Sequence, residues 1–117
     1  GGDRDKGKRP QMGKVAEHLA DKIFITSDNP RSENPHTIID DICSGLNLPK
    51  QAHIIENRAE AIKTALEQRS PNTIVLVAGK GHETHQEING QYFDFDDREH
   101  IRAHFALSTY SQLDSIQ

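Results

Sequence analysis

The sequence of 117 residues predicts an α/β domain with a mostly parallel sheet, and three observations support this. Short apolar runs at 22–26, 53–55 and 73–78 are typical of strands, and stretches of helical period separate them. Strands that alternate with helices pair in parallel through right-handed crossovers. The turn signal Asn89-Gly90 predicts an antiparallel β-hairpin near the C-terminus. We therefore expect one domain over 1–117, with helices on both faces of the sheet.

The helix starts are predicted by their capping residues. Asn34 followed by Pro35 supplies an N-cap and a first helical residue for a helix that ends near Gly45. Asn57 is the predicted cap of a helix over 58–69. Asp96, with a glutamate three residues later, predicts a capping box at the start of the last helix. Each of these signals is local, so each predicts a boundary independently of the others.

The first helix and the central strand are predicted from apolar spacing. Apolar residues recur at helical intervals over 11–20, which predicts an amphipathic helix there. The run 73–78 is the most hydrophobic in the chain and predicts a central strand that helices cover on both faces. The glycine-rich, charged stretch that opens the chain is typical of a loop between a strand and a helix. We therefore expect that a first strand is missing ahead of Gly1.

Composition excludes several classes of partner. Hydrophobic residues make up 33% of the chain, Trp is absent and the formal net charge is -4. A net negative charge argues against nucleic acid or an anionic membrane as the main partner. Cys43 is the only cysteine, so no intrachain disulfide is possible, and no apolar run approaches a membrane span. These features predict a cytoplasmic protein.

Two polar loops follow predicted parallel strands and are expected to share one crevice, because open α/β sheets bind ligands at the carboxyl ends of their strands. The first, Asp28-Asn29-Pro30-Arg31, offers the planar donor fork of Arg31, which matches a carboxylate or a phosphate. The second contains Gly79 and Glu83; glycine allows close approach of a ligand, and a carboxylate accepts from an amine. Alternatively, the first loop is only a capped turn with a solvated arginine, and the second only a glycine turn.

No complete catalytic set or metal site is predicted. Residues 2–9 nearly match a phosphate-binding P-loop, but Arg9 stands where Ser or Thr must bind Mg²⁺, so we reject that interpretation and keep only an anion contact at Arg4 or Lys8. His82 and His85, like His100 and His104, lack a convincing third metal ligand. We predict no metal site, and Cys43 is expected to be a small buried residue of a helix.

Three separated motifs nevertheless carry a family resemblance. Gly-Gly-Asp-Arg-Asp-Lys-Gly-Lys-Arg-Pro at 1–10, Asp-Asn-Pro-Arg at 28–31 and Ala-Gly-Lys-Gly-His-Glu at 78–83 occur in this order, followed by Phe-Asp-Asp-Arg-Glu at 95–99. Together they resemble the C-terminal domain of Mur ligases, specifically of the members that add meso-diaminopimelate in peptidoglycan synthesis. The resemblance implies a Rossmann-like domain, the last of three in an ATP-dependent amide-forming enzyme. It also implies that ATP, Mg²⁺ and UDP-MurNAc-dipeptide are bound mainly by domains absent from this chain.

The resemblance also implies roles for single residues. Five positions match those that bind meso-diaminopimelate in the family: Arg4, Asn29, Arg31, Gly79 and Glu83. Lys6 and Lys8 are expected to contact a nucleotide or another anion, and no residue of this chain is expected to be catalytic. Two alternatives stay open, namely a stand-alone α/β module that binds a small anion, and a related ligase domain that adds a different amino acid.

Overall fold

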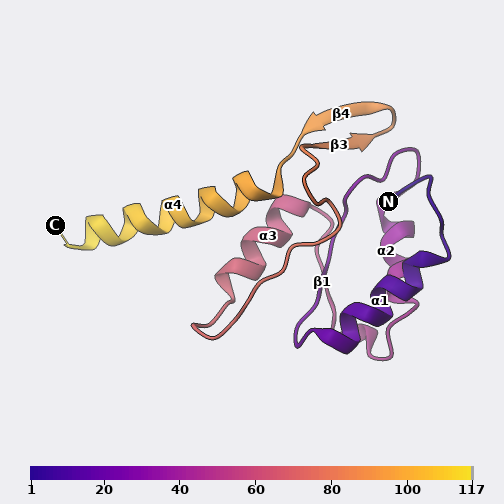
Figure 1. Ribbon diagram of the computed structural model, residues 1–117, viewed down its shortest axis with the longest axis horizontal. Coiled ribbons are helices and arrows are strands. Elements are labelled where there is room, and N and C mark those ends of the chain that lie inside the picture. Colours follow the sequence, from indigo (N-terminus) through magenta and orange to yellow (C-terminus); the bar gives the residue numbers. More distant parts are fainter. Residues whose placement is uncertain (117) are drawn as a thin grey trace.

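The computed structural model describes the backbone of residues 1–116 and the side chains of residues 1–107, and it confirms the α/β class. The elements follow in the order α1 (Lys8–Leu19), β1 (Phe24–Ile25), α2 (Pro35–Cys43), the short 3₁₀ helix η1 (Pro49–Gln51), β2 (His53–Ile54), α3 (Arg58–Glu67), β3 (His85–Ile88), β4 (Gln91–Asp94) and α4 (Asp97–Ile116). α1 packs on α2 and α3 packs on α4, and Figure 1 shows β1 between these two helix pairs.

The predicted parallel pairing is present between β1 and β2, where Phe24 lies opposite His53 and Ile25 opposite Ile54. The small core lies beneath this pair and is formed by Ile25, Ile39 and Leu46. Cys43 packs at the edge of the core and is partly buried, not fully buried as predicted, and burial raises the pKa of its thiol. The parallel pair therefore joins the first two αβ units and fixes where the loop after β1 emerges.

The local predictions at the helix starts and the hairpin are confirmed. The side chains of Asn34 and Asn57 each accept a hydrogen bond from a backbone N–H in the first turn of α2 and α3, and Asp96 does the same for α4. β3 and β4 pair in antiparallel register around Asn89 and Gly90, whose φ angles of 50° and 77° suit a type I′ turn. Within the described residues, the Asp96 N–H does not donate to the Glu99 side chain, so the second bond of the predicted capping box is not formed.

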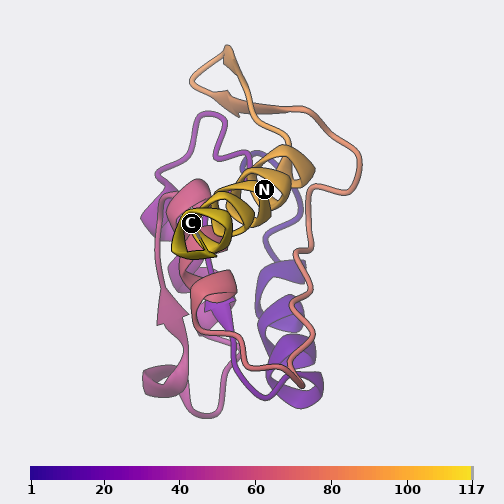
Figure 2. The ribbon, with the colours of Figure 1, turned by 90° about the vertical axis from the view of Figure 1, so that its left-hand side faces the viewer.

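The prediction of a central strand over 73–78 is wrong for this chain. The segment is extended, but no ladder of backbone hydrogen bonds joins it to a strand within residues 1–116. Ile74 is 95% exposed and Leu76 is 85% exposed, and Figure 2 shows the segment running alone along one side of the molecule. A strand needs a neighbour to pair with, and none of the described residues supplies one beside 73–78. The expected strand ahead of Gly1 stays a prediction.

The burial of α1 also differs from the prediction. The expected apolar face is largely open, with Met12 and Val15 more than half exposed, whereas Arg9 and Gly13 are buried against α2. A Cβ atom at Gly13 would lie 2.2 Å from the Ile42 carbonyl oxygen, so the two helices approach through this glycine. The closest approach of the two helices therefore turns the Met12 and Val15 side of α1 away from α2.

Candidate functional site at two polar loops

The loop after β1 is held between the N-terminal segment and the β3–β4 hairpin. On one side, the N–H of Gly2 donates to the carbonyl of Asn29 at 2.7 Å, and a Cβ atom at Gly2 would lie 1.7 Å from the Pro30 carbonyl oxygen. Ser32 donates its hydroxyl to Asp3 at 2.6 Å. Only glycine fits the contact with Pro30, so the first residues of the chain are docked directly on the loop that carries Arg31.

Arg9 and Glu33 fix the base of this loop. The guanidinium of Arg9 is buried, and it donates to both carboxylate oxygens of Glu33 at 3.2 and 2.6 Å and to Asp41 at 2.9 Å. The backbone N–H of Asp3 also donates to Glu33. These donors, Arg9 above all, lower the pKa of Glu33 to about 2. Arg9, which occupies the Mg²⁺-ligand position of the P-loop pattern, is therefore a structural cation.

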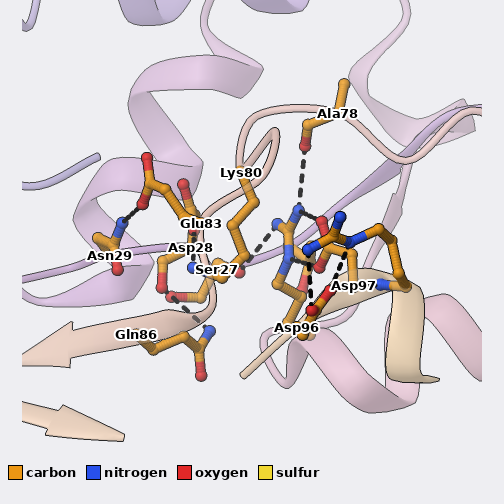
Figure 3. A network of polar contacts seen from close by, with 12 residues as sticks. Ser27, Asp28, Asn29, Ala78, Lys80, Glu83, Gln86, Asp96 and Asp97 are labelled. Atoms are coloured by element: carbon orange, nitrogen blue, oxygen red, sulfur yellow. Dashed lines mark hydrogen bonds and ion pairs between the residues drawn. The ribbon is translucent and has the colours of Figure 1, made fainter. Parts of the chain in front are cut away.

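On the other side, Asn29 bridges the loop to the hairpin and to the second polar loop, residues 79–83, which follows the extended segment 73–78. Asn29 is only 4% exposed; its Nδ2 donates to Glu83 at 3.1 Å, and its Oδ1 accepts from the backbone N–H of Glu87 at 2.9 Å. Figure 3 shows the Asn29 amide turned toward the Glu83 carboxylate. The amide is therefore held by two hydrogen bonds, and it fixes the position of the Glu83 carboxylate.

Lys80 joins the two polar loops, residues 28–31 and 79–83, through buried contacts. Its ammonium is fully buried, donates to Asp28 Oδ1 at 2.9 Å, and also donates to the carbonyl of His85. The Asp28 carbonyl accepts from Gln86 at 3.0 Å, a contact drawn in Figure 3. Gly79, next to Lys80, has a φ of +105°, which only glycine adopts without strain. The sequence analysis did not predict this role of Lys80. A usable signal was that one polar loop carries a lysine and the other carries Asp28, which can form an ion pair.

Arg31 has a backbone conformation that is uncommon for a residue with a side chain. Its φ is 52°, in the left-handed region, and two backbone hydrogen bonds to β3 and the turn hold it there: Arg31 N–H to the Glu87 carbonyl, and Asn89 N–H to the Arg31 carbonyl. The side chain donates from Nε to Glu87 at 3.1 Å and from Nη1 to the Gly2 carbonyl at 2.8 Å. Left-handed residues that surrounding contacts hold in place cluster at binding sites.

The predicted site residues are therefore brought together to different degrees. Asn29 contacts Glu83 directly, whereas Arg31 is linked to Asn29 through Glu87, whose carboxylate accepts from Arg31 and whose N–H donates to Asn29. A Cβ atom at Gly1 would lie 3.0 Å from Arg31 Nη1 and 3.9 Å from Arg4 Cγ. Arg4 is exposed at the rim. Lys6 is also exposed, 3.7 Å from Glu33, and the equally exposed Lys8 has no ion-pair partner in the described chain.

The base of the cluster is tied to the rest of the domain by a buried ion pair. Arg58, at the start of α3, donates to both oxygens of Asp97 at 2.8 Å and to the carbonyls of Ser27 and Ala78 at 3.4 and 3.1 Å. Both residues are less than a tenth exposed. Ser27 and Ala78 immediately precede the two polar loops, residues 28–31 and 79–83. One guanidinium therefore ties both loops to the starts of α3 and α4.

Other features of the described residues offer no competing site. A surface hollow of about 390 Å³ lies near the N-terminal ends of β1 and β2, and Glu17 on its wall already accepts from the N–H groups of Asn47 and Leu48. Within the described chain, no group of three or more His, Cys, Asp or Glu side chains is arranged to hold a metal ion. No described helix is long and apolar enough to cross a membrane.

Comparison with known proteins defines the class of this domain. The family model described as "Mur ligase, glutamate ligase domain" matches residues 1–81, so the chain belongs to the Mur ligase family. Proteins named UDP-N-acetylmuramoyl-L-alanyl-D-glutamate--2,6-diaminopimelate ligase are similar to it. The one from Trichormus variabilis is 54% identical over 88% of this chain, and the one from Chlorobaculum tepidum is 51% identical over 91%. The chain spans about a fifth of the length of these relatives, 21% in each case.

A solved structure supports the same class. A structure titled as UDP-N-acetylmuramoyl-L-alanyl-D-glutamate--2,6-diaminopimelate ligase superposes with a TM-score of 0.87 and is 44% identical. The alignment covers 93% of this chain and 23% of that chain. The resemblance that the three motifs indicated is thereby confirmed, and so is the α/β fold with its C-terminal hairpin.

Glu33 supplies a prediction about acid stability. Its pKa is lowered to about 2 from an ordinary value of 4.5, so the folded state favours the ionised carboxylate. The stability this gives is fully present above about pH 4.5 and is lost as the pH falls toward about 2. Glu33→Gln should therefore lower the urea midpoint at neutral pH, and the difference from wild type should shrink as the pH falls through this window. A difference that stays constant down to the lowest pH would contradict this account.

Proposed function

We propose that this chain is the amino-acid-binding domain of an ATP-dependent amide-forming ligase that adds meso-diaminopimelate to UDP-MurNAc-L-Ala-D-Glu in peptidoglycan synthesis. The observation that supports this most strongly is that Asn29 joins the two polar loops that carry Arg31 and Glu83: its amide donates to Glu83 and accepts from Glu87, the residue that pairs with Arg31. The far end of diaminopimelate carries a carboxylate and an ammonium group. A guanidinium and a carboxylate complement both groups at once.

The individual roles follow from where each side chain lies. Arg31 binds the far carboxylate, Glu83 accepts from the far ammonium, and Asn29 holds Glu83 in place. Gly79 lets the backbone approach the ligand, and the exposed Arg4 binds a carboxylate of the same ligand. Lys6 and Lys8 remain available for a nucleotide phosphate, because they lie on the exposed N-terminal segment.

The chemistry itself is proposed to take place on other parts of the full-length ligase. There ATP would phosphorylate the D-glutamyl γ-carboxylate, and the diaminopimelate amine would displace phosphate from the acyl phosphate to form the amide. The residues of this chain do not fit a primary Mg²⁺ and ATP site, since Arg9 is buried against Glu33 and Asp41 where a hydroxyl ligand would be needed. This single domain therefore contributes the amino-acid site. The nucleotide substrates place the enzyme in the cytoplasm.

A direct test measures amide formation by the full-length ligase with meso-diaminopimelate and with L-lysine. The proposal predicts turnover that depends on ATP and on diaminopimelate, with L-lysine a much poorer substrate. A clear preference for lysine or another amino acid would assign the domain to a different member of the family. Tight binding of a small anion by a chain with no ligase partner would support the stand-alone module.

The isolated chain is expected to be inactive. Its described residues include no phosphate-cradling loop and no group that positions Mg²⁺, and these supply most of the catalysis of phosphoryl transfer. Purified chain should show neither ATP hydrolysis nor amide formation, and it should bind diaminopimelate more weakly than the full-length ligase, because the remaining walls of the site are absent. Steady ATP hydrolysis that persists through further purification would contradict this.

A further inference from the structure

Arg31 forms an ion pair with Glu87, and this ion pair occupies one of the donors that a ligand carboxylate would use. Nε of Arg31 lies 3.1 Å from Oε2 of Glu87, and the two side chains are 17% and 25% exposed. We propose that Glu87 is a built-in competitor for the substrate carboxylate, so that this residue sets how tightly the site binds the far end of an amino acid. The proposal rests on the proposed function, in which Arg31 binds that carboxylate.

Glu87 is fixed next to Arg31 by its backbone. Its N–H donates to Asn29 Oδ1, and its carbonyl accepts from the N–H of Arg31 at 2.9 Å. The isolated bridge between Arg31 and Ile88 continues this pairing. The side chain of Glu87 therefore starts from a position that the site itself fixes, and its carboxylate returns to Arg31 whenever no other anion is bound.

Some N–H donors of Arg31 are already used by protein acceptors, and this limits how a ligand carboxylate can bind. A guanidinium has five N–H groups, of which Nε is used by Glu87 and one on Nη1 by the Gly2 carbonyl. Among the described residues, none accepts from Nη2. A ligand carboxylate that pairs with Nε and Nη2 must displace Glu87, and one that pairs with Nη1 and Nη2 lies beside the charge of Glu87. In both cases the negative charge of Glu87 opposes the negative charge of the ligand.

The same charge acts differently on an amino acid that has no far carboxylate. L-Lysine presents an ammonium group at that end, so it does not compete with Glu87 for Arg31. Glu87 therefore reduces the advantage of diaminopimelate over lysine. Removing its charge while keeping its shape, as in Glu87→Gln, should increase that advantage.

The test is a kinetic comparison in the full-length ligase. Glu87→Gln should lower KM for meso-diaminopimelate by about 3- to 10-fold, the range expected for a partly exposed charge pair. The change in kcat should be smaller than the change in KM, and KM for L-lysine should not fall. Glu67→Gln is the matched control, because it removes the charge of a glutamate that pairs at 4.0 Å with Lys63 on the surface of α3. It should behave as wild type.

A second arm shows whether the effect passes through Arg31. On an Arg31→Ala background, Glu87→Gln should not lower KM further, since the charge for which Glu87 competes is gone. The proposal is overturned if Glu87→Gln leaves KM for meso-diaminopimelate unchanged or raises it. It is also overturned if Glu87→Gln lowers this KM equally in the wild-type and the Arg31→Ala ligase.

Failure of the proposed function is distinguishable from failure of this inference. A wild-type ligase that forms no product with diaminopimelate overturns the function. In that case the pairing is read directly in the chain, from the Nε–H signal of Arg31 in a heteronuclear NMR spectrum. That signal should shift in Glu87→Gln and stay in place in Glu67→Gln. An Arg31 signal that does not respond to Glu87→Gln overturns the counter-ion role itself.

Discussion

Replacing Arg31 with alanine in the full-length ligase is expected to lower kcat/KM for meso-diaminopimelate by about 30- to 1000-fold, which corresponds to roughly 2 to 4 kcal/mol of transition-state binding. The side chain of Arg31 is largely buried between Glu87 and the Gly2 carbonyl, so its pair with a ligand is shielded from solvent. Shielded charge-assisted pairs are stronger than pairs at the surface. The measurement is kcat/KM for meso-diaminopimelate in wild type and variant.

L-Lysine is the internal control for Arg31. Lysine has no carboxylate to place on Arg31, so its kcat/KM should change by a different factor, and the ratio of diaminopimelate to lysine should collapse. Arg31→Lys should restore only part of the loss, because an ammonium is a point charge without the planar fork. Arg102→Ala removes an exposed arginine of α4 and should have little effect. An equal loss with both amino acids would show that Arg31 serves only the structure of its loop.

Removing the charge of Asp97 is expected to destabilise the chain by about 3 to 5 kcal/mol, the usual cost of leaving one partner of a buried ion pair alone. Asp97→Asn keeps one side-chain oxygen as an acceptor but removes the negative charge and the second carboxylate oxygen, so the buried guanidinium of Arg58 loses its bonded counter-ion and keeps only neutral acceptors such as the Ser27 and Ala78 carbonyls. This is a large part of the 5 to 15 kcal/mol of a typical domain. The measurement is urea unfolding followed by circular dichroism.

The matched control for Asp97 is again Glu67→Gln, because Lys63 and Glu67 form an exposed pair on the surface of α3. That change should alter the unfolding free energy by less than about 0.5 kcal/mol. Arg58→Met combined with Asp97→Leu should recover part of the loss, since an apolar pair needs no partner charge. A cost for Asp97→Asn similar to that of the control would contradict the role given to this pair.

The features that the sequence could predict are those decided by neighbouring residues. The N-caps Asn34, Asn57 and Asp96 and the Asn89-Gly90 turn each depend on a few adjacent backbone groups, and all four are present. The strand over 73–78 depended instead on a partner from elsewhere, which the described residues do not supply. The periodicity of a strand predicts which side chains are buried, but it does not show which neighbouring strand will pair with its backbone N–H and C=O groups.

The sequence predicted which residues of the candidate site could bind a ligand. It did not predict the contacts that position those residues. The motif around Asn29 and Arg31, and Glu83 after the next apolar run, are visible in the sequence. Asn29 and Glu83 are 54 residues apart, and Arg31 and Glu87 are 56 apart, so their pairing depends on how the loops pack. The buried ammonium of Lys80 and the pair of Arg58 with Asp97 likewise join distant segments. No local pattern specifies which charges meet across such separations.

The central claim, that these loops bind the far end of diaminopimelate, is tested most directly by titrating the isotope-labelled chain with meso-diaminopimelate and, separately, with L-lysine, followed by heteronuclear NMR. The account predicts that diaminopimelate shifts signals of residues 28–33, 79–83 and the N-terminal segment, including the side chains of Asn29 and Arg31. Lysine should leave the Arg31 signal unchanged. Shifts confined to other surfaces, or an Arg31 signal that responds equally to both amino acids, would contradict it.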